Sequence, residues 1–287
     1  MFAYARRHPL LAFYALVFVI SWGGILLIVG PGGFLTTTGT SAIFPAVGVA
    51  SILGPSIAGL LMIGIVAGPA GFRDLLARLR RWRVGACWYA VALLTAPLVN
   101  VAALVALSLT SSEFRPAIVT SDDKVSLLLL GLLIGLLVAF CEELGWTGFA
   151  TPRFLMRRGV LTTGLTMGVI WGVWHLPLFA GNTADAGQVG PLLLMAALLF
   201  VWLPPYRVLM VWVYDHTQSL LLVILMHLVI VIGQYTFNIE NVSPEGRFAS
   251  VVAFGVGLWA VVGVLALATH GHLSREGGPA ATGPITA

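Results

Sequence analysis

The sequence contains very little charge. Only 9% of its 287 residues are Asp, Glu, Lys or Arg, whereas a soluble globular domain has about 25%. Lys124 is the only lysine, and the other basic residues are arginines. The two cysteines, Cys87 and Cys141, are too few for a disulfide framework or a zinc ribbon, and we expect both to pack between helices. The shortage of charge excludes a soluble globular protein.

Apolar residues take the place of the missing charge. They make up 59% of the chain, and the mean hydropathy is +0.99. A membrane span needs about 20 consecutive apolar residues, and such runs recur from end to end. We predict an all-α polytopic membrane protein with about eight spans, at residues 10–30, 43–67, 86–109, 126–149, 163–181, 190–213, 218–237 and 248–269. The first run lacks a small-residue cleavage pattern, so we expect it to be retained as a span.

The joints between these runs are too short to hold a soluble domain. We therefore predict one transmembrane domain over residues 1–275, with the chemistry-bearing core at 126–237. Residues 276–287 are rich in Gly, Pro, Ala and Thr, which predicts a disordered tail. The joint at 73–83 alternates Arg with apolar residues and fits either an amphipathic surface helix or a basic loop.

The distribution of basic residues predicts the orientation. Eleven would lie on one side of the membrane: Arg6, Arg7, Arg73, Arg78, Arg80, Arg81, Arg83, Arg153, Arg157, Arg158 and Arg275. Three would lie on the other side: Arg115, Lys124 and Arg247. Since basic residues favour the cytoplasmic side, we predict a cell-membrane protein with both termini in the cytoplasm. Lipid headgroups account for the basic balance, and we predict no nucleic-acid partner. The sequence says nothing of the oligomeric state.

A few ionisable side chains nevertheless fall inside the predicted spans: Glu142, Glu143, His175, Arg207 and His227. A carboxylate at the bilayer centre costs about 2.5–3.5 kcal/mol by insertion scales, and two adjacent carboxylates also repel each other. All five residues belong to the second half of the chain, whereas the first three spans have none. This distribution indicates a functional site held by a scaffold.

The depth of these residues groups them further. At a rise of 1.5 Å per residue from the arginine-rich side, Glu142, His175 and His227 lie about 15, about 18 and about 14 Å deep. Three helices thus place a carboxylate and two imidazoles in one layer. Neighbouring helix residues point about 100° apart, so only one of Glu142 and Glu143 faces the site directly.

Two hydrolytic chemistries suit this layer. Glu142, His175 and His227 could hold a zinc ion with an open fourth position, and the second glutamate would take the proton of bound water. Without a metal, a buried glutamate would act as general base on water while the histidines stabilise the oxyanion. A structural explanation also exists, since an intramembrane His often bonds a neighbouring helix. A proton-coupled transporter is less well supported, because the polar residues crowd one half of the chain.

Three motifs in this region match a known family. Residues Glu142–Phe149 read EELGWTGF, Trp171–His175 place an aromatic residue four positions before His, and His227 starts a His-x-x-x-Asn-like motif. In order and spacing they resemble the CPBP family of intramembrane proteases, which includes the type II CAAX prenyl endopeptidases and bacteriocin-processing or self-immunity proteins. The resemblance implies an eight-helix fold with a chamber open to the cytoplasm. It implies that Glu142 activates the water with support from Glu143, and that the two histidines bind a metal or the oxyanion.

Two positions depart from the family pattern. Thr147 replaces the Arg of the first motif, and Val231 replaces the Asn or Asp of the third. We expect Arg207 to supply the missing charge to Glu143 and Gln234 to offer the missing amide. Losing an oxyanion donor costs about 10²–10³ in rate, so a second interpretation is a non-catalytic member that binds a peptide or lipidated partner, such as an immunity protein. The first interpretation is an endopeptidase acting on a membrane-associated protein or peptide, and the arginine-rich composition suggests a bacterial source.

Overall fold

The structure, a computed structural model, describes residues 2–33, 42–179, 190–239 and 242–275. Within these ranges it contains helices and no strand, as predicted. The long helices are α2 (Pro9–Gly33), α3 (Phe44–Leu79), α4 (Ala86–Ser108), α6 (Lys124–Gly145), α8 (Val160–Trp174), α11 (Leu203–Thr217), α12 (Leu220–Thr236) and α13 (Pro244–Ala268). Shorter elements connect them: α1 (Phe2–Arg7), η1 (Ser112–Phe114), α5 (Ala117–Thr120), η2 (Trp146–Ala150), α7 (Thr151–Leu155), α9 (Leu176–Phe179), α10 (Pro191–Ala196) and η5 (Ala197–Val201). The predicted tail at 276–287 lies outside the described residues.

Six stretches of the described chain are long and apolar enough to cross a membrane: Pro9–Gly33, Phe44–Leu79, Ala86–Ser108, Lys124–Leu155, Pro191–Thr217 and Pro244–Ala268. Helices α8 and α12 are also apolar, but they have only 15 and 17 residues. At 1.5 Å per residue they are about 23 and about 26 Å long, slightly less than the hydrocarbon core of about 30 Å. The chain is a multi-pass membrane protein, and two of the predicted spans are shorter than expected.

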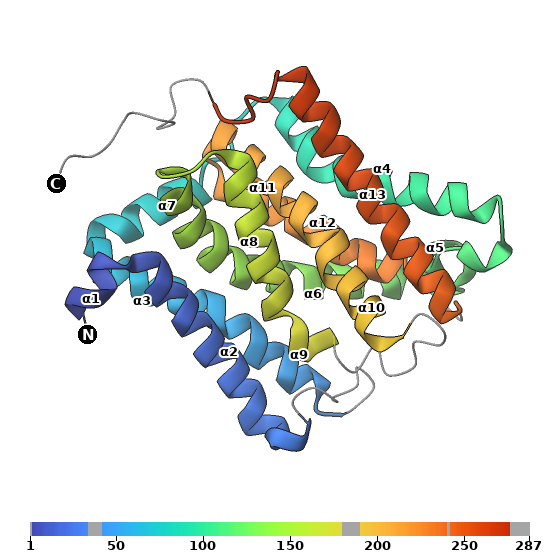
Figure 1. The fold of residues 1–287 in the computed structure, drawn as a ribbon, viewed down its shortest axis with the longest axis horizontal. Coiled ribbons are helices and arrows are strands. Elements are labelled where there is room, and N and C mark those ends of the chain that lie inside the picture. Colours follow the sequence, from blue (N-terminus) through green and yellow to red (C-terminus); the bar gives the residue numbers. More distant parts are fainter. Residues whose placement is uncertain (1, 34–41, 180–189, 240–241, 276–287) are drawn as a thin grey trace.

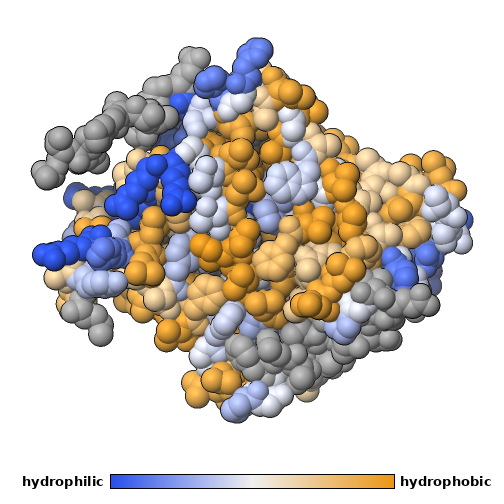
Figure 2. Space-filling view, in the orientation of Figure 1, coloured by the Kyte–Doolittle hydropathy of each residue, from blue (hydrophilic) through white to orange (hydrophobic). Residues whose placement is uncertain are grey.

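The elements are arranged with two distinct ends. Helices α1 and α7 lie at one end of the bundle, and α5 and α10 lie toward the other (Figure 1). Hydrophobic residues cover most of the visible face, whereas hydrophilic residues gather where α1 and α7 lie (Figure 2). Helices α11 and α12 are buried on nearly all sides and form the centre, with α11 packed along α8 and α12 along α6. The ionisable residues of the predicted site belong to α6, α11 and α12, except His175, which directly follows α8.

The two cysteines differ from the prediction and from each other. Cys141 is half-buried in α6. Cys87, in the first turn of α4, is exposed, so the prediction that both thiols pack between helices is wrong for this residue. The apolar run of α4 begins before the helix is covered by its neighbours, which a hydropathy pattern does not reveal.

Four prolines in the helices are compensated by donors from other helices. A proline has no N–H, so the carbonyl four residues earlier loses its helical hydrogen bond. In α3, Pro55 leaves the Ser51 carbonyl free, and the Ser21 hydroxyl of α2 donates to it at 2.6 Å. Three further prolines show the same arrangement. The Ile65 carbonyl, four residues before Pro69, accepts from Arg6 Nε at 2.9 Å, and the Gly148 carbonyl, four residues before Pro152, accepts from Arg78 Nη2 at 2.9 Å. The Val201 carbonyl, four residues before Pro205, accepts from Trp259 Nε1 at 3.2 Å. Each of these bonds connects two different helices or helix ends.

Helix α6, which carries both glutamates, begins at an acidic cap. The Asp123 carboxylate accepts the backbone N–H of Ser126 at 3.0 Å. Hydrogen bonds from the side chain and the backbone of Ser126 lower the pKa of Asp123, which is fully exposed. A lowered pKa means that the cap stabilises α6 while Asp123 is ionised, and that this contribution is lost as the pH falls through its pKa.

Candidate active site

Glu142 and Glu143 occupy the last turn of α6 and are almost completely buried, with 2% and 0% of their surfaces exposed. The chain then widens into the π-helix η2 before α7 begins. Single π turns of this kind occur frequently at functional sites. Because adjacent side chains point about 100° apart, the two carboxylates meet different neighbours.

An arginine from α3 holds the π turn in place. Arg78 is 7% exposed, and its Nη atoms donate to the carbonyls of Gly148 at 2.9 Å and Thr147 at 3.5 Å. It also donates to the Tyr214 hydroxyl at 3.0 Å and pairs with Asp74 at 2.9 Å. The sequence placed this arginine in a surface joint. Its role arises because α3 continues as a helix beyond its kink at Gly68 and reaches the end of α6.

Glu142 is held through one oxygen. Its Oε2 accepts hydrogen bonds from the indole Nε1 of Trp171 at 2.9 Å and of Trp146 at 3.3 Å. No described residue donates to Oε1. The carboxylate is therefore oriented by two fixed donors and keeps one oxygen for another partner, such as a water molecule.

Glu143 is surrounded by donors. Its Oε1 accepts from Arg207 Nη1 at 2.8 Å and from His227 Nδ1 at 2.9 Å, and its Oε2 accepts from the Thr147 hydroxyl. Arg207 is 1% exposed and also donates to Thr147 at 3.4 Å. The predicted pairing of Arg207 with Glu143 is confirmed. Thr147, at the position where the family motif has Arg, connects the two charged groups.

The hydrogen bonds of the two histidines assign their tautomers. His175 Nδ1 lies 2.8 Å from the Trp171 carbonyl, which can only accept, so Nδ1 carries the proton. His227 Nδ1 faces Glu143 in the same manner. When neutral, each ring therefore keeps a lone pair on Nε2. The Trp171 ring contacts both imidazoles, with centroid distances of 5.5 Å to His175 and 5.2 Å to His227.

The predicted side chains therefore gather around one residue. Trp171 bonds Glu142 and contacts both histidines, and Glu143 joins the group through His227. In the sequence, Trp171 stands out only as the aromatic residue of a motif. The signal for its role was its residue type, because the indole of Trp carries an N–H donor that a Phe ring lacks. Val231 is buried and adds no polar group to this cluster.

The arrangement of donors bears on the predicted zinc ion. Both histidines have the Nδ1 anchors that commonly orient metal-ligating imidazoles. However, in the part of the chain that the structure describes, no three His, Cys, Asp or Glu side chains are placed so that they could hold one metal ion. The zinc site stays a prediction.

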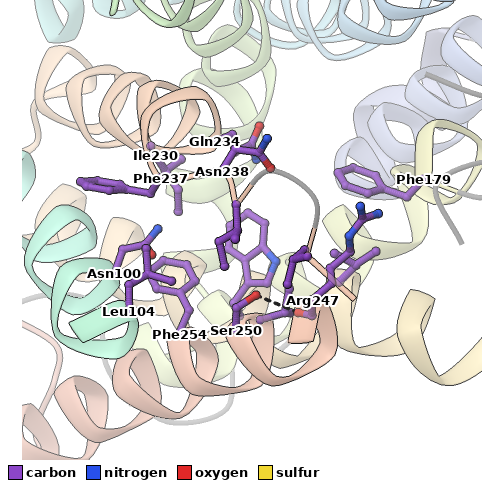
Figure 3. A pocket seen from close by; sticks show the side chains of 16 residues that line it. Asn100, Leu104, Phe179, Ile230, Gln234, Phe237, Asn238, Arg247, Ser250 and Phe254 are labelled. Carbon is purple, nitrogen blue, oxygen red and sulfur yellow. Dashed lines mark hydrogen bonds between the residues drawn. The ribbon is translucent and has the colours of Figure 1, made fainter. Parts of the chain in front are cut away.

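A cavity of about 420 Å³ lies beside this cluster (Figure 3). Phe179 in its wall contacts the His175 ring at 5.6 Å, and Trp202 contacts Trp171 at 6.5 Å. The wall is mainly apolar, with polar side chains at Asn100, Gln234, Asn238, Arg247 and Ser250. Because the cavity is formed by the end of α12 and the start of α13, it lies at the arginine-poor end of the bundle. Gln234, the predicted substitute amide, lines this cavity.

Comparison with known proteins gives two matches. Residues 124–232 match the family model described as Type II CAAX prenyl endopeptidase Rce1-like. The chain is also 27% identical over 129 residues to CAAX prenyl protease 2 of Methanococcus maripaludis. The aligned segment covers 44% of this chain and 46% of the relative. The chain therefore spans about half the length of this relative. The matched family segment begins with α6, ends within α12 and includes the whole cluster around Trp171.

Proposed function

We propose that this chain, a member of the CAAX protease family across residues 124–232, is an intramembrane endopeptidase. The proposed substrate is a membrane-associated protein or peptide. One observation carries the mechanism: Glu142 is a buried carboxylate with one oxygen fixed by two indoles and the other without a partner among the described residues. Such a group is positioned to accept a proton.

The proposed reaction uses this free oxygen. Glu142 Oε1 takes a proton from a water molecule, and the water oxygen attacks the carbonyl carbon of the peptide bond. The carbon–nitrogen bond then breaks, Glu142 passes the proton to the leaving amine, and a carboxylate and a free amine remain. The Nε2 atoms of His175 and His227 can accept a hydrogen bond from the water when neutral, or donate to the oxyanion when protonated.

Glu143 has a different proposed role. Its carboxylate is occupied by Arg207, His227 and Thr147, so it has little capacity left to receive a proton. We assign it the role of positioning His227, because its Oε1 accepts a hydrogen bond from His227 Nδ1 at 2.9 Å. A metal-dependent route would need Glu142, His175 and His227 to come together around one ion, a placement that the described residues do not have. Stoichiometric zinc in the wild-type protein that is lost in His175→Ala would favour that route.

The cavity beside the cluster is the proposed binding site for the substrate chain. The side-chain amides of Asn100, Gln234 and Asn238 have no hydrogen-bond partner among the described residues and line the cavity. An amide both donates and accepts, so it matches the backbone of an extended peptide. Apolar walls suit a hydrophobic side chain or a lipid group. Cleavage of a prenylated peptide compared with the same peptide without the prenyl group tests which of these the cavity prefers.

Hydrolysis in isotopically labelled water tests the proposal. The purified protein in lipid nanodiscs is incubated with a peptide library in H₂¹⁸O, and the products are analysed by mass spectrometry. Wild type is expected to release fragments carrying ¹⁸O at the new carboxyl group, whereas Glu142→Gln should release almost none. Equal product from both proteins would reject Glu142 as the base.

A second candidate function is binding without cleavage. It is favoured by Val231, since this buried side chain offers no donor where the family has Asn or Asp. In that case, wild type and Glu142→Gln would bind the same peptides with equal affinity and neither would form labelled fragments. The same experiment therefore distinguishes the two functions.

A further inference from the structure

A second cavity, of about 520 Å³, lies at the opposite end of the bundle from the candidate active site's cavity. It is formed by the start of α2, the C-terminal half of α3 and α7. Helix α3 bends at this cavity, where Gly68 adopts a positive φ of 57° immediately before Pro69. Because α3 bends here and does not continue straight, a space remains between α2, α3 and α7.

Cationic groups outnumber carboxylates around this cavity. Three guanidinium groups line it, from Arg78, Arg153 and Arg157, but only one carboxylate, from Asp74. Arg78 is already paired with Asp74 at 2.9 Å. Neither Arg153 nor Arg157 has a carboxylate within ion-pair distance among the described residues. Two guanidinium groups therefore line the cavity without a direct ion pair to any described residue.

These two arginines are prepared for a ligand in different ways. Arg153 is half-buried, its guanidinium lies 3.7 Å from the Phe149 ring centre, and one of its nitrogens donates to the Phe149 carbonyl at 2.8 Å. Its remaining N–H groups are thus held in one orientation. Arg157 is exposed and makes no side-chain hydrogen bond to a described residue. A guanidinium suits a phosphate because its N–H groups form paired hydrogen bonds to two oxygens.

The remaining wall is apolar. Leu10, Ile63, Val66 and Met156 line the same cavity, and α3 continues from it with Leu61, which is 50% exposed. The cavity lies between helices at the end where α1 and α7 place hydrophilic residues next to the hydrophobic face (Figures 1 and 2). A soluble anion would use only the arginines, whereas a lipid would use the arginines and the apolar wall together.

We propose that this cavity binds an anionic membrane phospholipid, with its phosphate on Arg153 and Arg157 and the first part of an acyl chain against the apolar wall. Basic pockets between transmembrane helices are a recognised form of anionic-lipid site. Binding would reach the candidate active site through two side chains, because Arg153 and Arg78 hold the Phe149 and Gly148 carbonyls of the π turn that follows Glu142 and Glu143. The lipid should therefore stabilise the folded protein, and this inference does not depend on the proposed function.

Adjacent arginines provide a matched test. Arg157 lines the cavity, whereas Arg158 is equally exposed and does not. The full chain in detergent is titrated with phosphatidylglycerol or with phosphatidylcholine of the same acyl chains. Bound lipid is counted by native mass spectrometry, and the unfolding temperature is measured in parallel. Inorganic phosphate at the same concentrations forms a third arm.

Phosphatidylglycerol is expected to bind and to raise the unfolding temperature of wild type and Arg158→Ala. Arg157→Ala should bind it about five-fold more weakly, as expected for the loss of one arginine contact near the surface. Equal weakening in both variants would overturn the proposal, because it would indicate general attraction to positive charge. Equal stabilisation by inorganic phosphate would overturn it in favour of a soluble phosphate ligand.

Discussion

At the scale of single residues, the two adjacent glutamates have different surroundings. Glu142 is fixed by neutral indole donors and keeps one free oxygen. Glu143 accepts from a cation, an imidazole and a hydroxyl. This difference follows from the helix, which turns adjacent side chains about 100° apart toward different neighbours. It supports the assignment of Glu142 as base and Glu143 as positioning residue.

The indole of Trp171 is expected to matter through its N–H. Trp171→Phe keeps an aromatic ring but removes the 2.9 Å hydrogen bond to Glu142. A hydrogen bond to a charged group is worth about 1.5–3 kcal/mol, so kcat should fall about 10- to 100-fold. Trp174→Phe is the matched control, because Trp174 is buried but its Nε1 has no partner among the described residues. An equal loss of kcat in both variants would contradict this role.

The ion pair of Arg207 with Glu143 makes a prediction about stability. Arg207→Leu leaves a buried carboxylate without its cation, which should lower the free energy of unfolding by about 3–5 kcal/mol. Adding Glu143→Gln removes the stranded charge, so the double variant should be more stable than Arg207→Leu alone. Equilibrium unfolding in mixed micelles measures both. If Arg207→Leu is as stable as wild type, Arg207 does not compensate the buried charge of Glu143.

The depth of three site residues could be predicted from the sequence. Depth follows from the rise per residue and the positions of the arginines, so Glu142, His175 and His227 could be placed in one layer. The contacts of Trp171 and Arg78 could not be predicted. They depend on how each helix is rotated and on how far α3 continues beyond its kink, which apolar periodicity does not encode.

At the scale of elements, a close approach of α3 and α6 places the glutamates. A Cβ atom on Gly145 would lie 2.1 Å from the Pro55 carbonyl oxygen, and one on Gly59 would lie 2.7 Å from the Gly145 Cα atom. Only glycines allow this spacing. The close packing of α6 against α3 therefore fixes the last turn of α6, which carries Glu142 and Glu143.

Gly145→Ala should therefore separate these helices. Over-packing of this kind costs about 1–3 kcal/mol, and the displaced π turn should also lower activity. Gly263→Ala in α13 is the control, because nothing lies within 4 Å of a Cβ atom there. We expect that control to be neutral or slightly stabilising in thermal unfolding. Equal stability of the two variants would show that the approach of α3 and α6 is not tight.

The helices themselves were easier to predict than their ends. Each predicted span contains a helix because apolar length alone determines where a chain can cross a membrane. The shortness of α8 and α12 could not be predicted. Helix α8 ends where His175 turns its ring toward Trp171, and α12 begins after Gln218 in a left-handed conformation with φ 53°.

At the scale of the whole molecule, the two ends of the bundle carry different cavities. The arginine-lined cavity lies at the end predicted to be cytoplasmic, and the cavity beside His175 lies at the other. The family resemblance implies a chamber open to the cytoplasm. The orientation of the bundle therefore decides from which side the substrate would reach the cavity beside His175.

Thiol labelling can determine this orientation. Cys87 is exposed at the arginine-rich end, and Asn238→Cys in a Cys87→Ser background places a thiol in the other cavity. If the arginine-rich end is cytoplasmic, a membrane-impermeant maleimide added to intact cells should label the engineered thiol of this variant and should leave Cys87 of the wild type unlabelled. The reverse pattern would contradict the predicted topology and would place the substrate cavity on the cytoplasmic side.

The most direct test of the division between the two glutamates compares Glu142→Gln with Glu143→Gln in nanodiscs, with peptide cleavage and unfolding temperature measured on the same samples. Glu142→Gln should fold with a nearly unchanged unfolding temperature and lose cleavage by at least about 10²-fold, because the general base is gone. Glu143→Gln should lower the unfolding temperature markedly, because the buried charge of Arg207 loses its partner. Full cleavage by Glu142→Gln, or unchanged stability of Glu143→Gln, would contradict the account.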